Sequence, residues 1–139
     1  MWNFDRTLSG NLNKSRVLIN NVAVTNTNGS NVSAVQSDTD PFTIGAVFRG
    51  TSSPIVLSAF EGNIDEISIF NTSLSSDEMT SIYNEGTPNN VSDLEISGLV
   101  NYYRNGDNDN GTGTTITDQG SSAQNGNLIN TPTFEEDVP

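Results

Sequence analysis

The 139-residue sequence contains no cysteine and no histidine. Without cysteine the chain forms no disulfide and has no thiol nucleophile. Without histidine it lacks the usual imidazole base and the commonest nitrogen ligand of zinc. Any bound metal must therefore take oxygen ligands, which is the chemistry of calcium and magnesium.

Basic residues are also few. The chain has five Lys and Arg against 17 Asp and Glu, which gives a formal net charge of −12. Because nucleic acid and anionic lipid surfaces repel such a chain, we expect neither as its partner. No apolar run approaches the roughly 20 residues that a membrane-spanning helix needs, so the sequence predicts a soluble protein.

The sequence does contain a series of short runs in which apolar and polar residues alternate, a pattern typical of β-strands. Asn20-Asn21, inside VLINNVAV, predicts a tight hairpin turn because asparagine tolerates positive φ. The length suits one domain, and many short strands in one domain predict an all-β, two-sheet antiparallel sandwich. The expected strands lie near residues 2–6, 16–25, 32–36, 42–48, 55–60, 64–70, 94–103, 114–117 and 127–129.

One short helix is expected near residues 76–84. Ser75 can cap its first turn, and Glu78 stands three residues later as the capping-box partner. Met79 falls on the apolar face of this helix, and Gly86 offers a left-handed end. The helix is therefore predicted to cover an edge or an end of the sandwich.

The segment GNIDEISIF raises a question about charge, because two carboxylates interrupt its alternating isoleucines. If residues 64–70 form a strand, Asp65 shares a face with the isoleucines that follow it, and Glu66 lies on the opposite face. A buried carboxylate without a partner is costly. Asp65 is therefore expected to meet a cation, backbone N–H donors or an arginine such as Arg104.

Three stretches carry a resemblance to a known family: SRVLINNVAV, DPFTIGAVF and FEGNIDEISIFNTSLSSDEMTSIYNEG. A hairpin, a strand with Ile-Gly and a G-x-I-D-E strand leading into an acidic helix resemble the second half of a laminin G-like domain. That family belongs to the concanavalin A-like lectin/glucanase superfamily. The resemblance covers residues 1–86 and implies a jelly-roll form of the sandwich.

The tail is similar to the first strands of the same family. Residues 94–130 contain an aromatic-rich strand, an acidic Gly loop, TTITD and NGNLI, and they come last instead of first. Three interpretations stay open. The tail completes a permuted single domain over residues 1–130, the chain is the end of a longer protein, or strands are exchanged between subunits of an oligomer. Residues 131–139 are an acidic tail.

The related glucanases use paired carboxylates, so catalysis must be considered. Retaining glycosidases hold two carboxyl groups about 5 Å apart. Asp65 and Glu66 are adjacent and face opposite ways, and Glu61 stands about 13 Å before Asp65 along an extended strand. The spacing therefore predicts a protein that is not an enzyme.

The resemblance also implies a calcium site. In several laminin G-like modules calcium sits where the first strands meet the I-D-E strand. The matching positions here are Asp65 and Asp118, with Asn125 nearby. Asp107 and Asp109 of GDNDNG form a second acidic cluster, but its spacing does not fit an EF-hand loop. The alternative for this cluster is a solvated acidic turn.

Sugar binding needs aromatic rings that stack on pyranose faces, and polar side chains that bond the hydroxyls. The candidate rings are Trp2, Tyr102 and Tyr103, with Asn101 and Asn105 as polar partners. The alternative is that these rings belong to the core. Tyr102 and Tyr103 point to opposite faces of a strand, so at most one is expected on a given surface.

Two functions are therefore expected. The first is a non-catalytic module that recognises an extracellular or cell-surface glycan or receptor, with calcium as a candidate cofactor. The second is a structural appendage or decoration protein of a virion that makes protein contacts without binding sugar, because the tail resembles virion-associated proteins of tailed bacteriophages. Either function implies an extracellular or virion-associated location.

Overall fold

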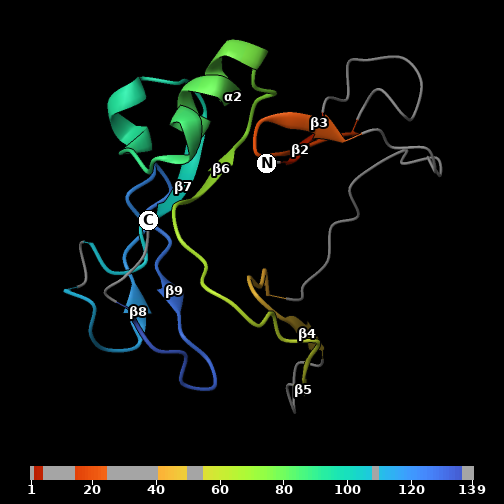
Figure 1. The fold of residues 1–139 in the computed structure, drawn as a ribbon. Coiled ribbons are helices and arrows are strands. Elements are labelled where there is room, and N and C mark those ends of the chain that lie inside the picture. Colours follow the sequence, from red (N-terminus) through yellow and green to blue (C-terminus); the bar gives the residue numbers. More distant parts are fainter. Residues whose placement is uncertain (1, 5–14, 25–40, 50–54, 108–109, 136–139) are drawn as a thin grey trace.

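The computed structural model describes residues 2–4, 15–24, 41–49, 55–107 and 110–135. These residues form short strands, one α-helix and two short 3-10 helices (Figure 1). The strands are β1 (Trp2–Phe4), β2 (Ser15–Ile19), β3 (Val22–Val24), β4 (Val47–Arg49), β5 (Ile55–Leu57), β6 (Ile67–Phe70), β7 (Leu99–Tyr103), β8 (Thr115–Ile116) and β9 (Gly126–Asn127). The helices are α2 (Ser76–Tyr83), η1 (Asn84–Gly86) and η2 (Val91–Leu94).

The strands do not assemble into the expected jelly-roll sandwich, and that prediction is wrong. Within the described ranges they form one three-stranded sheet, β1-β2-β3, and three separate pairs, β4-β5, β6-β7 and β8-β9. The physical reason is that each strand is only two to five residues long, and most strand side chains that the structure describes are exposed or half-buried. The described part has five buried hydrophobic residues, too few for an apolar layer between two closed sheets. The strand expected near residues 32–36 lies outside the described residues.

The β2–β3 hairpin confirms the turn predicted from sequence. Asn20 has φ 49° and Asn21 has φ 60°, the left-handed values that a two-residue hairpin turn of type I′ requires. Leu18 points into the molecule and is 4% exposed. The Asn21 side-chain amide donates to the Thr80 hydroxyl oxygen of α2 at 3.1 Å, so the turn of the hairpin lies beside the helix.

Helix α2 begins with the predicted capping box. The Ser75 hydroxyl accepts from the Glu78 N–H at 3.2 Å, and the Glu78 carboxylate accepts from the Ser75 N–H at 2.7 Å. The left-handed residue that ends the helix is Asn84, with φ 43° and its N–H donating to the Thr80 carbonyl. The expected end at Gly86 is therefore wrong, because asparagine also accepts positive φ.

The small core lies where α2, η2 and β7 meet. Met79 of α2 and Tyr102 of β7 are fully buried, and Val91 of η2 is 3% exposed. Figure 1 shows α2 over one end of the antiparallel β6–β7 pair, in which Ile67 stands opposite Tyr103. Residues distant in sequence are thus brought together, and the tail strand β7 pairs with the strand that follows the I-D-E motif.

Strand β7 has a second partner on its other edge. Tyr103 forms a bridge with Asp118. The Gln119 N–H donates to the Tyr102 carbonyl at 2.8 Å, and the Ser122 N–H donates to the Val100 carbonyl at 2.9 Å. The segment 118–122 therefore runs along β7.

In the described residues, no helix has the length and apolar character to cross a membrane.

Candidate functional site

Strand β7 separates two clusters of polar side chains. Side chains alternate along a strand, so Tyr102 and Arg104 point to one face while Asn101 and Tyr103 point to the other. We name the clusters after their central carboxylates. The Glu66 cluster contains Glu66, Tyr102, Arg104 and Asp107. The Asp118 cluster contains residues 118–125 and Asn101 of β7.

The I-D-E motif lies before its strand, not within it. Strand β6 begins at Ile67, and Glu66 has φ 50°, a left-handed value that breaks the alternation expected through this segment. Asp65 accepts the Glu66 N–H at 2.8 Å. Burial raises the pKa of Asp65, and the negative charges of Glu66 and Asp107 add to the rise. The expectation that Asp65 sits mid-strand is wrong. The arginine expected as a partner of Asp65, Arg104, forms its ion pair with Glu66.

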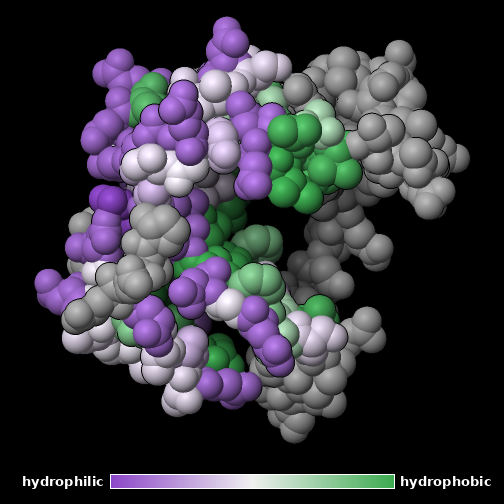
Figure 2. Space-filling model, in the orientation of Figure 1, coloured by the Kyte–Doolittle hydropathy of each residue, from purple (hydrophilic) through white to green (hydrophobic). Residues whose placement is uncertain are grey.

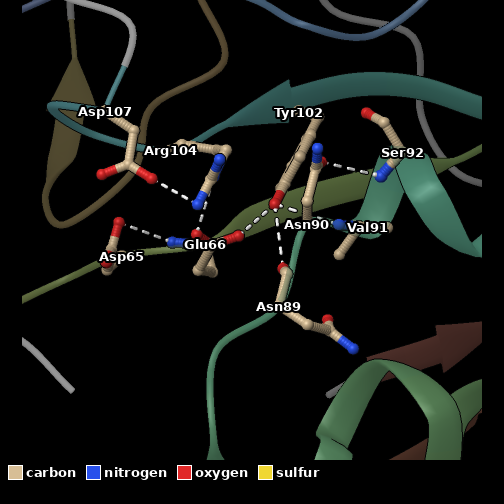
Figure 3. Close-up of polar contacts among 9 residues, drawn as sticks. All are labelled: Asp65, Glu66, Asn89, Asn90, Val91, Ser92, Tyr102, Arg104 and Asp107. Carbon is tan, nitrogen blue, oxygen red and sulfur yellow. Dashed lines mark hydrogen bonds and ion pairs between the residues drawn. The ribbon is translucent and has the colours of Figure 1, made fainter.

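Glu66 binds two partners from β7 and its end (Figure 3). One carboxylate oxygen accepts from the Arg104 Nε at 3.0 Å, and the other accepts a short hydrogen bond from the Tyr102 hydroxyl. A second guanidinium nitrogen of Arg104 pairs with Asp107. The Tyr102 oxygen also accepts from the Val91 N–H at 3.1 Å. The cluster therefore ties the residue that precedes β6 to η2 and β7.

The pKa of the Tyr102 phenol should change when the hydrogen bond to Glu66 is removed. Burial, followed by the hydrogen bond to Glu66, raises the pKa of Tyr102 to about 12 from an ordinary 10.0. In Glu66→Gln, we expect the pKa of Tyr102 to fall but to stay above 10.0, because burial remains. Titration by near-ultraviolet absorbance measures it, with Tyr102→Phe to assign the signal and Glu61→Gln as a charge-matched control on an exposed residue.

The same shift predicts how stability depends on alkaline pH. The folded pKa of Tyr102 lies above the unfolded value, so this group stabilises the folded state below about pH 10 and loses that contribution as the pH rises towards 12. Glu66→Gln should flatten this part of the stability curve. Identical alkaline curves for Glu66→Gln and the unchanged chain would contradict the role of the hydrogen bond.

Asp118 organises the second cluster. It is 7% exposed, and its two oxygens accept five hydrogen bonds, each between 2.7 and 2.8 Å. Burial alone would raise the pKa of Asp118, but the donors outweigh it and lower that pKa to about 2. The donors are the N–H groups of Tyr102, Gly120 and Gln124, the Asn101 amide and the Ser122 hydroxyl.

These contacts bear on the predicted calcium ligands. A carboxylate has about four lone-pair sites, so five donors leave Asp118 no oxygen for a cation. Asn125 uses its side-chain oxygen to accept the Asp118 N–H at 3.0 Å. Asp107 is paired with Arg104, and Asp109 lies outside the described residues. In the part that the structure describes, no three acidic side chains are grouped to hold a metal ion. Calcium binding stays a prediction.

The predicted sugar-binding residues are also engaged internally. Tyr102 is fully buried, and the half-buried Tyr103 donates its hydroxyl to the Gln124 carbonyl at 2.8 Å. The amide of Asn105 donates to the Ile64 carbonyl at 2.7 Å. The amide of Asn101 donates to the Asp118 carboxylate at 2.8 Å. Trp2 lies in β1, and its side chain is outside the described part.

Sequence reasoning missed an exposed apolar surface on the β2–β3 hairpin. Val17 pairs with Val24 and Ile19 pairs with Val22, so these four side chains share one face, opposite Leu18. Their exposures are 36%, 46%, 62% and 68%. Figure 2 shows them as a hydrophobic patch at the position of the hairpin. We call this set the hairpin face. The signal was the alternation in VLINNVAV, which predicted two strands but not which side would be covered.

A second apolar region lies before β6. Phe42 is 76% exposed and Phe60 is 60% exposed. Phe60 and Ile64 line an open hollow of about 540 Å³, together with Gly45, Asn63 and Asp65. Asp65 is thus the one predicted metal ligand found beside this hollow, and the surrounding side chains are mainly apolar.

Comparison with protein-family models, characterised proteins and solved structures found no match for this chain. The assignment of function therefore depends on the residues and their geometry.

Proposed function

We propose that this chain is a non-catalytic structural module that acts through protein–protein contacts. The observation that supports the proposal is the hairpin face, four aliphatic side chains exposed together on one side of a sheet. Single exposed apolar residues are normal on a protein surface, whereas a contiguous patch is typical of an interaction site.

The energetics of the hairpin face favour a protein partner. Full burial of one valine or isoleucine side chain contributes about 1.5–3 kcal/mol. A sugar has hydroxyl groups that need hydrogen-bonding partners, and valine and isoleucine side chains provide none. Another protein can instead present apolar side chains of its own, as in the cores of protein interfaces.

The polar side chains support the same proposal, because the structure uses them for its own stability. Asp118, Asn101 and Tyr102 are hydrogen-bonded within the chain. Glu66 is bound by Arg104 and Tyr102, so it is poorly placed to act as a nucleophile or as a general acid. A virion appendage, which the sequence resemblance implied, is one setting that this function fits.

The proposal is tested by placing a photo-crosslinking residue at Val22 and, as a control, at Ile129, which is exposed outside the hairpin face. We expect a cross-link from position 22 to a protein that mass spectrometry identifies. Ile19→Asp should abolish this cross-link, and position 129 should not form it. The labelled chain should give no signal on a glycan array.

Two results would overturn the proposal. One is saturable glycan binding that survives Ile19→Asp but is lost in Tyr103→Ala. This result would restore the glycan-binding function predicted from sequence. The other is the absence of any protein cross-link at position 22.

A further inference from the structure

We infer that the hollow beside Asp65 binds an arginine side chain of a partner protein. This inference goes beyond the proposed function, because the hollow shares no residue with the hairpin face. It depends on how the hollow is built, on the state of the Asp65 carboxylate and on the charges around it.

The walls of the hollow come from segments that lie apart in the sequence. The Phe60 N–H donates to the Gly45 carbonyl at 2.7 Å, which joins the residues before β4 to those before β6. A Cβ at Gly45 would lie 3.1 Å from the Ile64 Cδ1, so glycine at this position lets the isoleucine pack closely. The Asn105 amide donates to the Ile64 carbonyl at 2.7 Å. Contacts of the folded chain therefore define these walls.

Asp65 is the one acidic residue among the five that line the hollow. Its Oδ1 accepts the Glu66 N–H at 2.8 Å. Among the described residues, Asp65 has no ion pair and its Oδ2 accepts no hydrogen bond. Burial raises the pKa of this carboxyl, because the ionised form loses solvation. A cation in the hollow would compensate this charge.

The charges next to the hollow also favour a cation. Figure 3 shows Arg104 between Asp107 and Glu66, with Asp65 beside Glu66. The Arg104 Nε pairs with Glu66 at 3.0 Å, and a second nitrogen pairs with Asp107. Three carboxylates are thus grouped with one guanidinium, which leaves an excess of two negative charges. This excess attracts a cationic group and repels an anionic one.

The lining of the hollow favours an organic cation over a metal ion. Calcium takes about six to eight oxygen ligands, whereas the side chains that line the hollow offer one carboxylate, the Asn63 amide and apolar atoms. The Phe60 ring is 60% exposed, and Ile64 is 37% exposed. A guanidinium bonds a carboxylate and stacks on an aromatic ring, and its methylene stem packs on apolar side chains. Arginine therefore matches both parts of this surface.

The size of the hollow indicates that the arginine belongs to a protein. The volume of about 540 Å³ exceeds that of one arginine side chain, so an apolar neighbour of the arginine also fits. A protein segment presents both groups together. We therefore expect a free alkylguanidinium to bind more weakly than an arginine with apolar residues on both sides.

Titration of the full chain with short peptides tests the inference, with the NMR signals of Phe60 and Ile64 as the readout. The probe is a capped Leu-Arg-Leu peptide, and its control carries citrulline, an uncharged group of the same shape, in place of arginine. We expect the arginine peptide to bind about tenfold more tightly, the scale of one ion pair together with one cation–π contact. Added salt should reduce this preference.

Substitutions locate the binding site within the hollow. Asp65→Asn should bind the two peptides equally, whereas Asp93→Asn, the same change at an exposed position, should keep the preference for arginine. Phe60→Ala should weaken binding of the arginine peptide. Phe42→Ala should not, because Phe42 is 76% exposed and does not line the hollow. Circular dichroism confirms that each variant is folded.

Each outcome decides the inference. Unchanged Phe60 and Ile64 signals overturn it, and so does equal binding of the two peptides to the unchanged chain or a preference that survives Asp65→Asn. Equal binding of butylguanidinium and the arginine peptide would assign the hollow to a small organic cation. Calcium chloride that shifts the same signals, but not in Asp65→Asn, would assign a metal site. The cross-link at position 22 is measured separately, so failure at the hollow and failure at the hairpin face are distinguishable.

Discussion

Gly120→Ala is expected to destabilise the protein by about 3 kcal/mol and to lower its melting temperature by about 10 °C. A Cβ at this position would overlap the Val100 carbonyl and would lie 2.6 Å from the Asn101 Cα. Both neighbours are backbone atoms of β7, so they cannot move aside as a flexible side chain could. The segment would have to leave β7, and the Gly120 N–H would lose its 2.8 Å bond to Asp118.

Gly126→Ala is the control for this substitution. A Cβ at Gly126 would have its nearest neighbour, an Ile116 side-chain atom, at 3.7 Å, which is ordinary van der Waals contact. We expect its melting temperature to stay close to that of the unchanged chain. Thermal melts followed by circular dichroism compare the two variants. Equal melting temperatures for Gly120→Ala and Gly126→Ala would show that segment 118–122 does not pack on β7 as described.

Asp118→Asn is expected to cost about 3 kcal/mol at neutral pH. The substitution keeps the shape of the side chain, but it removes the charge and turns one acceptor oxygen into a donor that faces other donors. Asp93→Asn is the control, because Asp93 is exposed and makes the same chemical change. Urea unfolding measures both free energies, and a cost below that of Asp93→Asn would contradict the assigned role.

The pH dependence gives an independent test of Asp118. Its folded pKa of about 2 lies below the ordinary value of 3.8, so the ionised carboxylate stabilises the folded state above about pH 4. This contribution, about 2 kcal/mol, is lost as the pH falls towards 2. Asp118→Asn should lose less stability over that range. If the free energy of unfolding of Asp118→Asn and that of the unchanged chain fell equally over this pH range, the acid-sensitive group would be a residue other than Asp118.

Local features of this fold were readable from sequence. Asn20-Asn21 predicted a hairpin because both positions of the turn need positive φ, and asparagine accepts it. Ser75 and Glu78 predicted the start of α2 because their spacing permits reciprocal capping. Each of these predictions depends on residues within four positions of one another.

Features that depend on distant contacts were not readable. Glu66 is neither glycine nor asparagine, so its positive φ carries no sequence signal, and it shifts the I-D-E motif out of the strand. The pairing of β6 with β7 decides that Glu66 meets Arg104. Asp118 was selected as a site residue, but two of its five donors, the Asn101 amide and the Tyr102 N–H, come from β7, which the sequence did not place beside it.

The β6–β7 pair has a consequence for the order of folding. The β2–β3 and β4–β5 hairpins join strands that are close in sequence, whereas β6–β7 requires closure of the segment 71–98, which includes α2. Closing a long loop costs chain entropy before the contacts between the two strands can form. Helices and hairpins close short segments and therefore form much faster. We expect α2, which Ser75 caps, to form early. We expect the docking of β7 on β6 to limit the folding rate. Substitutions in β7 should then slow folding more than substitutions in the hairpin.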